Sequence, residues 1–177
     1  MSDCEWLPPL AKVSPWEYSK QNNTYEMLYQ IFSYDIKNNN LNYLGFGVWF
    51  FPDMDDGKEQ IFWHLTSREK KARKVPRRKR KFYDGDTIPA QRYPDLRRSE
   101  RLPWVKPLIE NPNESEVLAW DYKEGDGVIK TYVWLKDYEF IVIMKKYRDN
   151  SRRLVTSFYV DSDYTYKDFE RKYRNRI

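Results

Sequence analysis

The sequence has few of the residues from which metal sites and disulfide bridges are built. Cys4 and His64 are the single cysteine and the single histidine among 177 residues. One cysteine excludes an internal disulfide, and its place near the start gives no reason to expect a catalytic thiol. Zinc and iron sites usually draw on several His and Cys ligands, and no carboxylate spacing indicates a magnesium site. We therefore expect a protein without a metal or another cofactor.

Long apolar segments are also absent. No stretch approaches the roughly 20 consecutive apolar residues that a membrane-spanning helix requires. The first residues, MSDCEWLPPL, do not combine a basic start with an apolar run, as a secretory signal would. These absences predict a soluble cytoplasmic protein with no membrane partner. A length of 177 residues is typical of one domain, so residues 1–177 are expected to form a single domain.

The first part of the chain predicts a helix followed by a hairpin. Over residues 16–36, apolar and aromatic side chains recur at the three- and four-residue spacing of one helical face, at Tyr25, Leu28, Tyr29, Phe32 and Ile36. Two apolar runs follow, at residues 43–51 and 59–65, and the segment PDMDDGK between them is rich in turn formers. We expect these runs to pair as two strands.

The second half predicts a meander of strands. Four β-rich runs lie at residues 116–122, 128–135, 139–145 and 153–160, with turn-forming segments between them. Alternation in IKTYVWL places Val133 and Leu135 on one face and Tyr132 and Trp134 on the other, whereas FIVIM predicts a strand buried on both faces. RRSERLPWVKPLIENP indicates a short helix or irregular segment, and residues 164–176 a charged helix. The prediction is an α+β domain with an antiparallel sheet of four to six strands, N-terminal helices and a C-terminal helix.

Positive charge is concentrated in one part of the chain. From Arg68 to Arg101 there are fourteen Lys or Arg and five Asp or Glu, a net of +9; the whole chain carries +5, so the remainder carries −4. Within this part, residues 66–95 predict a mobile basic loop. Such a loop either solubilises the protein or contacts the phosphate backbone of a nucleic acid. In the second case RNA would be bound by Arg68, Lys70, Lys71, Arg73, Lys74, Arg77, Arg78, Lys79, Arg80 and Lys81.

His64 immediately precedes this basic segment, at what the apolar run IFWHL predicts to be a strand end. Imidazole transfers protons near neutral pH, and the guanidinium groups of the nearby arginine cluster in PDLRRSER bind phosphate. Metal-independent RNA cleavage needs such groups, because the ribose 2′-hydroxyl must lose a proton and the extra charge on phosphorus must be stabilised. Trp134 or Tyr159 could stack a base if exposed.

The order of the segments HLTS, RRSERLPWVKPLIEN, KTYVWL, FIVIMKK and RLVTSFYV resembles the superfamily of small nucleases that includes barnase, EndoU, the colicin-type tRNases and RelE. The likeness spans about residues 40–173 and is greatest to phage-associated and toxin-type branches. It implies a barnase/RelE-like fold and a metal-independent endoribonuclease of toxin or phage-defence type. The expected substrate is tRNA or mRNA, the product a 2′,3′-cyclic phosphate, and the partner an antitoxin or immunity protein.

The resemblance also implies a catalytic set. Matched by residue type, it consists of the proton carrier His64, the phosphate-binding Arg98 and Arg101, the hydroxyl donors Thr156 and Ser157, and the weaker candidates Lys130 and Tyr159. The chain departs from EndoU in lacking a second histidine and from barnase in lacking an obvious Glu–His pair on adjacent strands. The complementary proton role is therefore open between Tyr159, Tyr132 and Glu100.

Two functions of other classes fit the same features. A non-catalytic nucleic-acid-binding module would use the basic segment and aromatic sheet without the histidine. An interaction protein of a phage or defence system would direct the basic segment toward an acidic partner.

Overall fold

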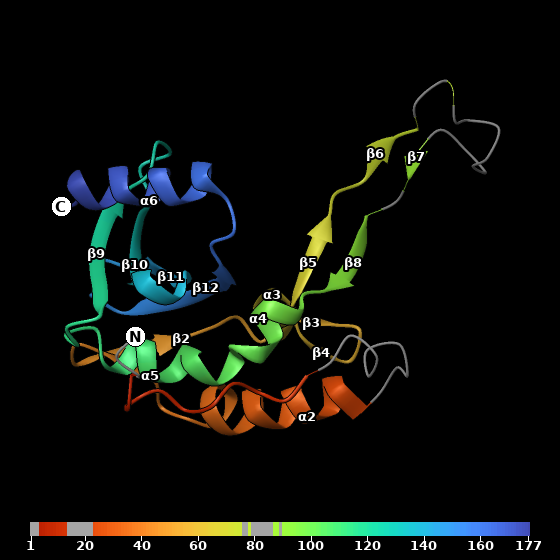
Figure 1. Ribbon diagram of the computed structural model, residues 1–177, viewed down its shortest axis with the longest axis horizontal. Helices are drawn as coiled ribbons and strands as arrows, with labels where there is room; N and C mark the ends of the chain where they lie inside the picture. Colours follow the sequence, from red (N-terminus) through yellow and green to blue (C-terminus); the bar gives the residue numbers. More distant parts are fainter. Residues whose placement is uncertain (1–3, 14–22, 76–77, 79–86, 89) are drawn as a thin grey trace.

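The computed structural model describes residues 4–13, 23–75, 78, 87–88 and 90–177. These residues form an α+β fold in which a central sheet lies between helix α6 (Asp163–Arg174) on one face and helices α2 (Asn23–Phe32) and α5 (Val105–Glu110) on the other (Figure 1). Each face of the sheet therefore has its own apolar core. In the part of the chain that is described, no helix is long and apolar enough to span a membrane.

The sheet has six strands in the order β1-β2-β12-β11-β10-β9. Their bounds are Asn42–Tyr43 (β1), Phe46–Trp49 (β2), Val117–Lys123 (β9), Ile129–Leu135 (β10), Phe140–Lys146 (β11) and Arg152–Tyr159 (β12). The last four strands are the predicted meander, and neighbours in it are antiparallel. β2, however, joins β12 in parallel, so the sheet is mixed and the expectation of a wholly antiparallel sheet is wrong. The long connection from β2 to β12 imposes no antiparallel pairing, whereas the short turns of the meander do.

The alternation read from the sequence matches the two cores. Val133 and Leu135 pack against α2 and α5, and Tyr132 and Trp134 pack beneath α6. Strand β11 supplies both cores, as predicted for FIVIM. Trp134 is fully buried, so it cannot stack a base, contrary to one reading of the sequence.

The predicted N-terminal helix is present where the chain is described. Helix α2 continues into a π-helical turn over Ser33–Lys37, and Leu28, Phe32 and Ile36 are buried along one face. Residues 16–22 of the predicted helix lie outside the described part.

The strand predicted over residues 59–65 is wrong, because from Gln60 onward this segment forms a helix. Helix α3 (Gln60–Thr66) buries Ile61, Phe62 and Leu65, with the Phe62 ring 5.6 Å from that of Phe32. Periodicity cannot distinguish a short buried strand from a short helix that is buried on nearly all sides. The turn formers before α3 make their own hairpin, β3 (Met54–Asp55) with β4 (Lys58–Glu59), around Asp56 and Gly57, both at positive φ.

The described part of the basic segment is a two-stranded ribbon. β5 (Ser67–Lys70) pairs with β8 (Gln91–Pro94), and farther out β6 (Arg73–Lys74) pairs with β7 (Thr87–Ile88). This ribbon, here called the arm, extends away from the body of the protein (Figure 1). Its described residues are thus paired strands where the sequence predicts an unpaired loop; Arg77, Lys79, Arg80 and Lys81 lie outside them.

Helix α4 (Leu96–Glu100) follows the arm, and a 3-10 turn over Leu102–Trp104 joins it to α5. Asp95 caps α4, because its Oδ1 accepts the Arg98 backbone N–H at 3.1 Å. The cap places α4 beside α3 at the base of the arm, where the chain enters and leaves it.

Candidate nucleic-acid interface

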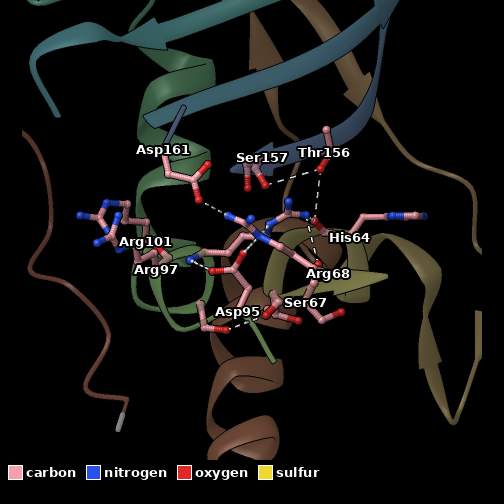
Figure 2. Close-up of polar contacts among 12 residues, drawn as sticks. His64, Ser67, Arg68, Asp95, Arg97, Arg101, Thr156, Ser157 and Asp161 are labelled. Carbon is pink, nitrogen blue, oxygen red and sulfur yellow. Dashed lines mark hydrogen bonds and ion pairs between the residues drawn. The ribbon is translucent and has the colours of Figure 1, made fainter. Parts of the chain in front are cut away.

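His64 lies in the last turn of α3, directly before the arm begins. The residue is exposed, and its ring makes no hydrogen bond with the described residues, whereas its backbone oxygen accepts Arg98 Nη1 at 2.7 Å and Thr156 Oγ1 at 3.2 Å. Figure 2 shows the side chain directed away from Arg97 and Arg101. The main chain of His64 is therefore fixed, and its imidazole is free to meet a ligand.

The surroundings of the ring lower the pKa of His64. Partial desolvation is the largest cause, and the positive charges of Arg92 and Arg98 add to it, while Glu69 and Asp55 act in the opposite direction. Neutral imidazole is therefore the main form at pH 7, as a proton acceptor requires.

A cavity of about 350 Å³ opens beside His64 at the base of the arm. Three arginines line it, Arg68, Arg92 and Arg98, and the carboxylates in its lining are Glu69 and Asp161. The lining also includes the rings of Phe158 and Tyr159. The cavity thus combines cationic groups with aromatic surface at the point where the arm meets the sheet.

Asp95 organises the arginines of this cavity (Figure 2). Its nearly buried carboxylate pairs with Nε of Arg68, and the other end of Arg68 reaches Asp161 at 2.9 Å. Arg98 donates from Nη1 to the carbonyls of His64 and Ser67, while its Nε has no hydrogen-bond partner among the described residues. Both arginines are therefore partly committed to holding the base of the arm.

The cavity beside His64 contains only part of the predicted catalytic set. Arg98 and Tyr159 line it, but Arg101 does not: its guanidinium pairs with Glu100 and stacks 4.8 Å from the Tyr159 ring centre. The expected convergence of His64 with Arg101 is therefore wrong. In Figure 2, Arg101 and His64 lie on opposite sides of the cluster.

Ser157 is not available to a ligand. The pairing of β12 with β11 shifts register around Val155, which places Ser157 opposite Val142 and fully buries it, with no hydrogen-bond partner for its Oγ among the described residues. Thr156 does reach the site, but its hydroxyl donates to the backbone of His64. Its visible role is to hold that residue in place.

The remaining candidates are placed or engaged elsewhere. Lys130 lies on the α6 side of the sheet, 3.9 Å from Glu124, and Tyr132 is buried there and bonded to the same carboxylate. Tyr159 donates its hydroxyl to Glu139, which raises the pKa of that hydroxyl, and Glu100 pairs with Arg101. None of these groups complements His64 in the described structure.

His64 also borders a second cavity, of about 340 Å³, to which α3 contributes Gln60 and Ile61 as well. Arg153 and Thr156 of β12 line it together with Phe51 and Asp53 from the segment after β2. His64 is therefore a lining residue of both cavities.

The arm carries positive charge that has no carboxylate partner among the described residues. Its exposed cations of this kind are Lys70, Lys71, Arg73 and Lys74, and Arg78, beyond the last described strand pair, is also exposed and without such a partner. On the body, by contrast, cations often have carboxylate partners, such as Lys146 with Asp121 at 2.7 Å and Lys172 with Glu124 at 2.9 Å. The predicted RNA-binding residues that the structure describes therefore lie on the arm or directly beyond it. Arg68, at the base of the arm, differs from the others because it is ion paired.

Sequence reasoning missed Arg92, Asp95 and Asp161 as residues of the site. A signal existed for Asp95, since an aspartate after Pro94 and before a helical segment is a typical N-cap. Arg92 carried none, because its position opposite Glu69 depends on the pairing of β5 with β8.

Among the described residues no group of three or more His, Cys, Asp or Glu side chains is arranged to hold a metal ion. Comparisons with protein-family models, curated proteins and solved structures find no match for this chain. Its function is therefore inferred from the interface itself.

Proposed function

We propose that this protein binds RNA, with the arm following the phosphate backbone and the cavity at the base of the arm receiving part of the strand. The observation that carries the proposal is the exposed row of arm cations without carboxylate partners among the described residues. Each such cation that neutralises a phosphate releases condensed counterions, which favours binding without requiring a particular base sequence.

The location of the positive charge favours a role in binding a ligand over a role in solubility alone. A charge run that only solubilises a protein can lie anywhere on its surface, but this one leads into a cavity lined by three further arginines. Its net charge opposes that of the rest of the chain, +9 over residues 68–101 against −4 elsewhere. This polarity would orient a polyanion toward the arm.

Titration of a labelled single-stranded RNA at several salt concentrations tests the proposal. The logarithm of the affinity should fall linearly with the logarithm of the salt concentration, with a slope of about −0.7 for each phosphate contact. Absence of binding at low salt would overturn the proposal and leave the interaction with an acidic protein partner as the remaining reading.

A second candidate function is cleavage of the bound RNA by a metal-independent ribonuclease of the barnase/RelE-like superfamily. The observation that favours it is the exposed position of His64 in the linings of both cavities, where its surroundings lower the pKa of the ring. His64 would accept the 2′-hydroxyl proton as the 2′-oxygen attacks phosphorus, giving a 2′,3′-cyclic phosphate while the departing 5′-oxygen takes a proton from solvent. A toxin acting on tRNA or mRNA, with an antitoxin or immunity protein as partner, belongs to this candidate.

If cleavage occurs, it should proceed in EDTA, and His64→Ala should lower the rate by about 10²- to 10⁴-fold, the usual contribution of one proton-transfer group. Binding should change little, because the arm is intact. Gel analysis of end-labelled RNA gives the rate, and undiminished cutting by His64→Ala would remove this candidate.

The lowered pKa of His64 also predicts a pH dependence of binding. As the pH falls below 6.5, toward the lowered pKa, the ring gains a positive charge beside the RNA, and affinity should rise. His64→Gln should bind with the same affinity at pH 7.5 and at pH 5.5 apart from changes shared with other groups. A wild-type affinity that falls on acidification, or an equal rise in His64→Gln, would contradict the placement of His64 against the strand.

A further inference from the structure

Two exposed aromatic rings and one half-buried ring form a patch next to the second cavity. Trp49 at the end of β2 and Phe51 just after it are 37% and 49% exposed. The Trp49 ring centre lies 5.3 Å from that of Phe51 and 5.3 Å from that of Tyr147. We call Trp49, Phe51 and Tyr147 the aromatic platform.

Two cations are fixed against the aromatic platform. Arg153, paired with Trp49 across β12 and β2, lies 4.6 Å from the Phe51 ring centre and donates to the Tyr147 hydroxyl at 3.3 Å. Lys145 lies 5.2 Å from the Tyr147 ring centre. Neither cation has a carboxylate partner among the described residues, so the charge is available to an anionic ligand.

The aromatic platform is continuous with the proposed RNA site. Phe51 and Arg153 line the second cavity, which shares His64 with the arginine-lined cavity at the base of the arm. The intervening carboxylate is Asp53, which is exposed in the lining of the second cavity. A path of cations and aromatic rings therefore runs from the arm, past His64, to Trp49.

We infer that the ligand is single-stranded RNA whose unpaired bases stack on the aromatic platform while its phosphates contact Arg153, the first cavity and the arm. The inference rests on the proposed function and specifies its substrate class. Exposed aromatic rings beside unpaired cations suit a strand with accessible base faces, whereas a duplex keeps those faces stacked inside. A protein partner would account for the exposed aromatic rings, but it would not explain why they lie next to the cationic site at the base of the arm.

Binding of an ordinary RNA oligonucleotide and an abasic one of the same length separates the two contributions, since both carry the same phosphates. Wild-type protein should prefer the base-containing strand by about tenfold or more, the effect expected for stacking of one or more bases. Trp49→Leu and Phe51→Leu, which keep apolar groups at both positions, should lose most of that preference. The slope of affinity against salt should not change, because no cation is removed. Tyr164→Ala, an exposed aromatic on α6, is the matched control and should bind as wild type does.

Unchanged preference for bases in the Leu variants, with intact RNA binding, would overturn this inference and leave the proposed function standing; the aromatic platform would then be free for a protein partner. Failure of wild-type protein to bind either oligonucleotide would overturn both. Thermal unfolding of each variant, expected to match wild type, ensures that a loss of preference reports on stacking. Arg153→Gln tests the phosphate contact separately. It should weaken binding to both oligonucleotides equally, because both carry the same phosphates.

Discussion

Replacing Lys70, Lys71, Arg73 and Lys74 with glutamine should remove most RNA binding at physiological salt. These side chains are exposed and have no ion-pair partner among the described residues, so their charge is available to phosphates. The slope of log affinity against log salt should flatten by about 0.7 for each replaced cation that contacts a phosphate, and so by up to about 3 in all. Fluorescence anisotropy of a labelled RNA over a salt series measures both quantities.

A matched control separates local contact from net charge. Lys12, Lys123, Lys167 and Arg174 are also exposed and lie off the arm, so their replacement with glutamine removes the same total charge. This control should retain nearly the wild-type slope and lose little affinity. An equal loss in the two variants would show that RNA responds to overall charge, and the arm would no longer be the binding element. Cooperative unfolding should survive in both, because exposed side chains contribute little to the core.

Asp121→Ala should have the largest effect on stability. Asp121 on β9 accepts Thr131 Oγ1 at 2.5 Å and Lys146 Nζ at 2.7 Å, and its carboxylate lies 3.6 Å from the buried guanidinium of Arg152. One carboxylate thus links residues from all strands of the meander. Its removal leaves Arg152, only 4% exposed, without its compensating charge. We expect a loss of about 3–5 kcal/mol in the free energy of unfolding, because breaking a buried ion pair strands the remaining charge.

For a chain of this size, such a loss should lower Tm by roughly 6–20 °C in a thermal unfolding experiment. Asp168→Ala is the control: Asp168 pairs with Arg171 and Lys172 of its own helix, its side chain is partly exposed, and Tm should fall much less than in Asp121→Ala. A Tm for Asp121→Ala within about 2 °C of wild type, less than the cost of one kcal/mol, would show that the network adds little to the fold.

The meander could be read from the sequence because its pattern is local. Strands β9 to β11 alternate between two cores or are apolar on both faces, and short turns connect successive strands, so the environment of most of their residues follows from the neighbours along the chain. Within the predicted charged helix, Tyr166, Phe169 and Tyr173 recur at helical spacing, and in the structure these rings pack on the sheet. Such periodicity specifies an element without knowledge of distant contacts.

The features that could not be predicted depend on distant contacts. The pattern of helix α3 resembles that of a buried strand because its apolar residues meet partners on several sides, among them Phe32 and Tyr29 of α2. Arg101 matches a phosphate ligand by residue type, but in the structure it pairs with Glu100 and lies against the Tyr159 ring. Likewise the burial of Ser157 follows from a register shift in β12 that alternation alone does not reveal. The site in the structure therefore contains the predicted His64 and Arg98, but several of its other residues differ from the predicted set.

The path of RNA across the protein is the claim on which the functional account depends. Photocrosslinking of a 4-thiouridine-labelled single-stranded RNA, followed by mapping of the modified peptides, tests it directly. The account predicts crosslinks in the arm, in the peptide containing His64 and on the segment containing Trp49 and Phe51. Crosslinks confined to α6, β9 and β10, or crosslinks that an excess of unlabelled RNA does not abolish, would contradict it.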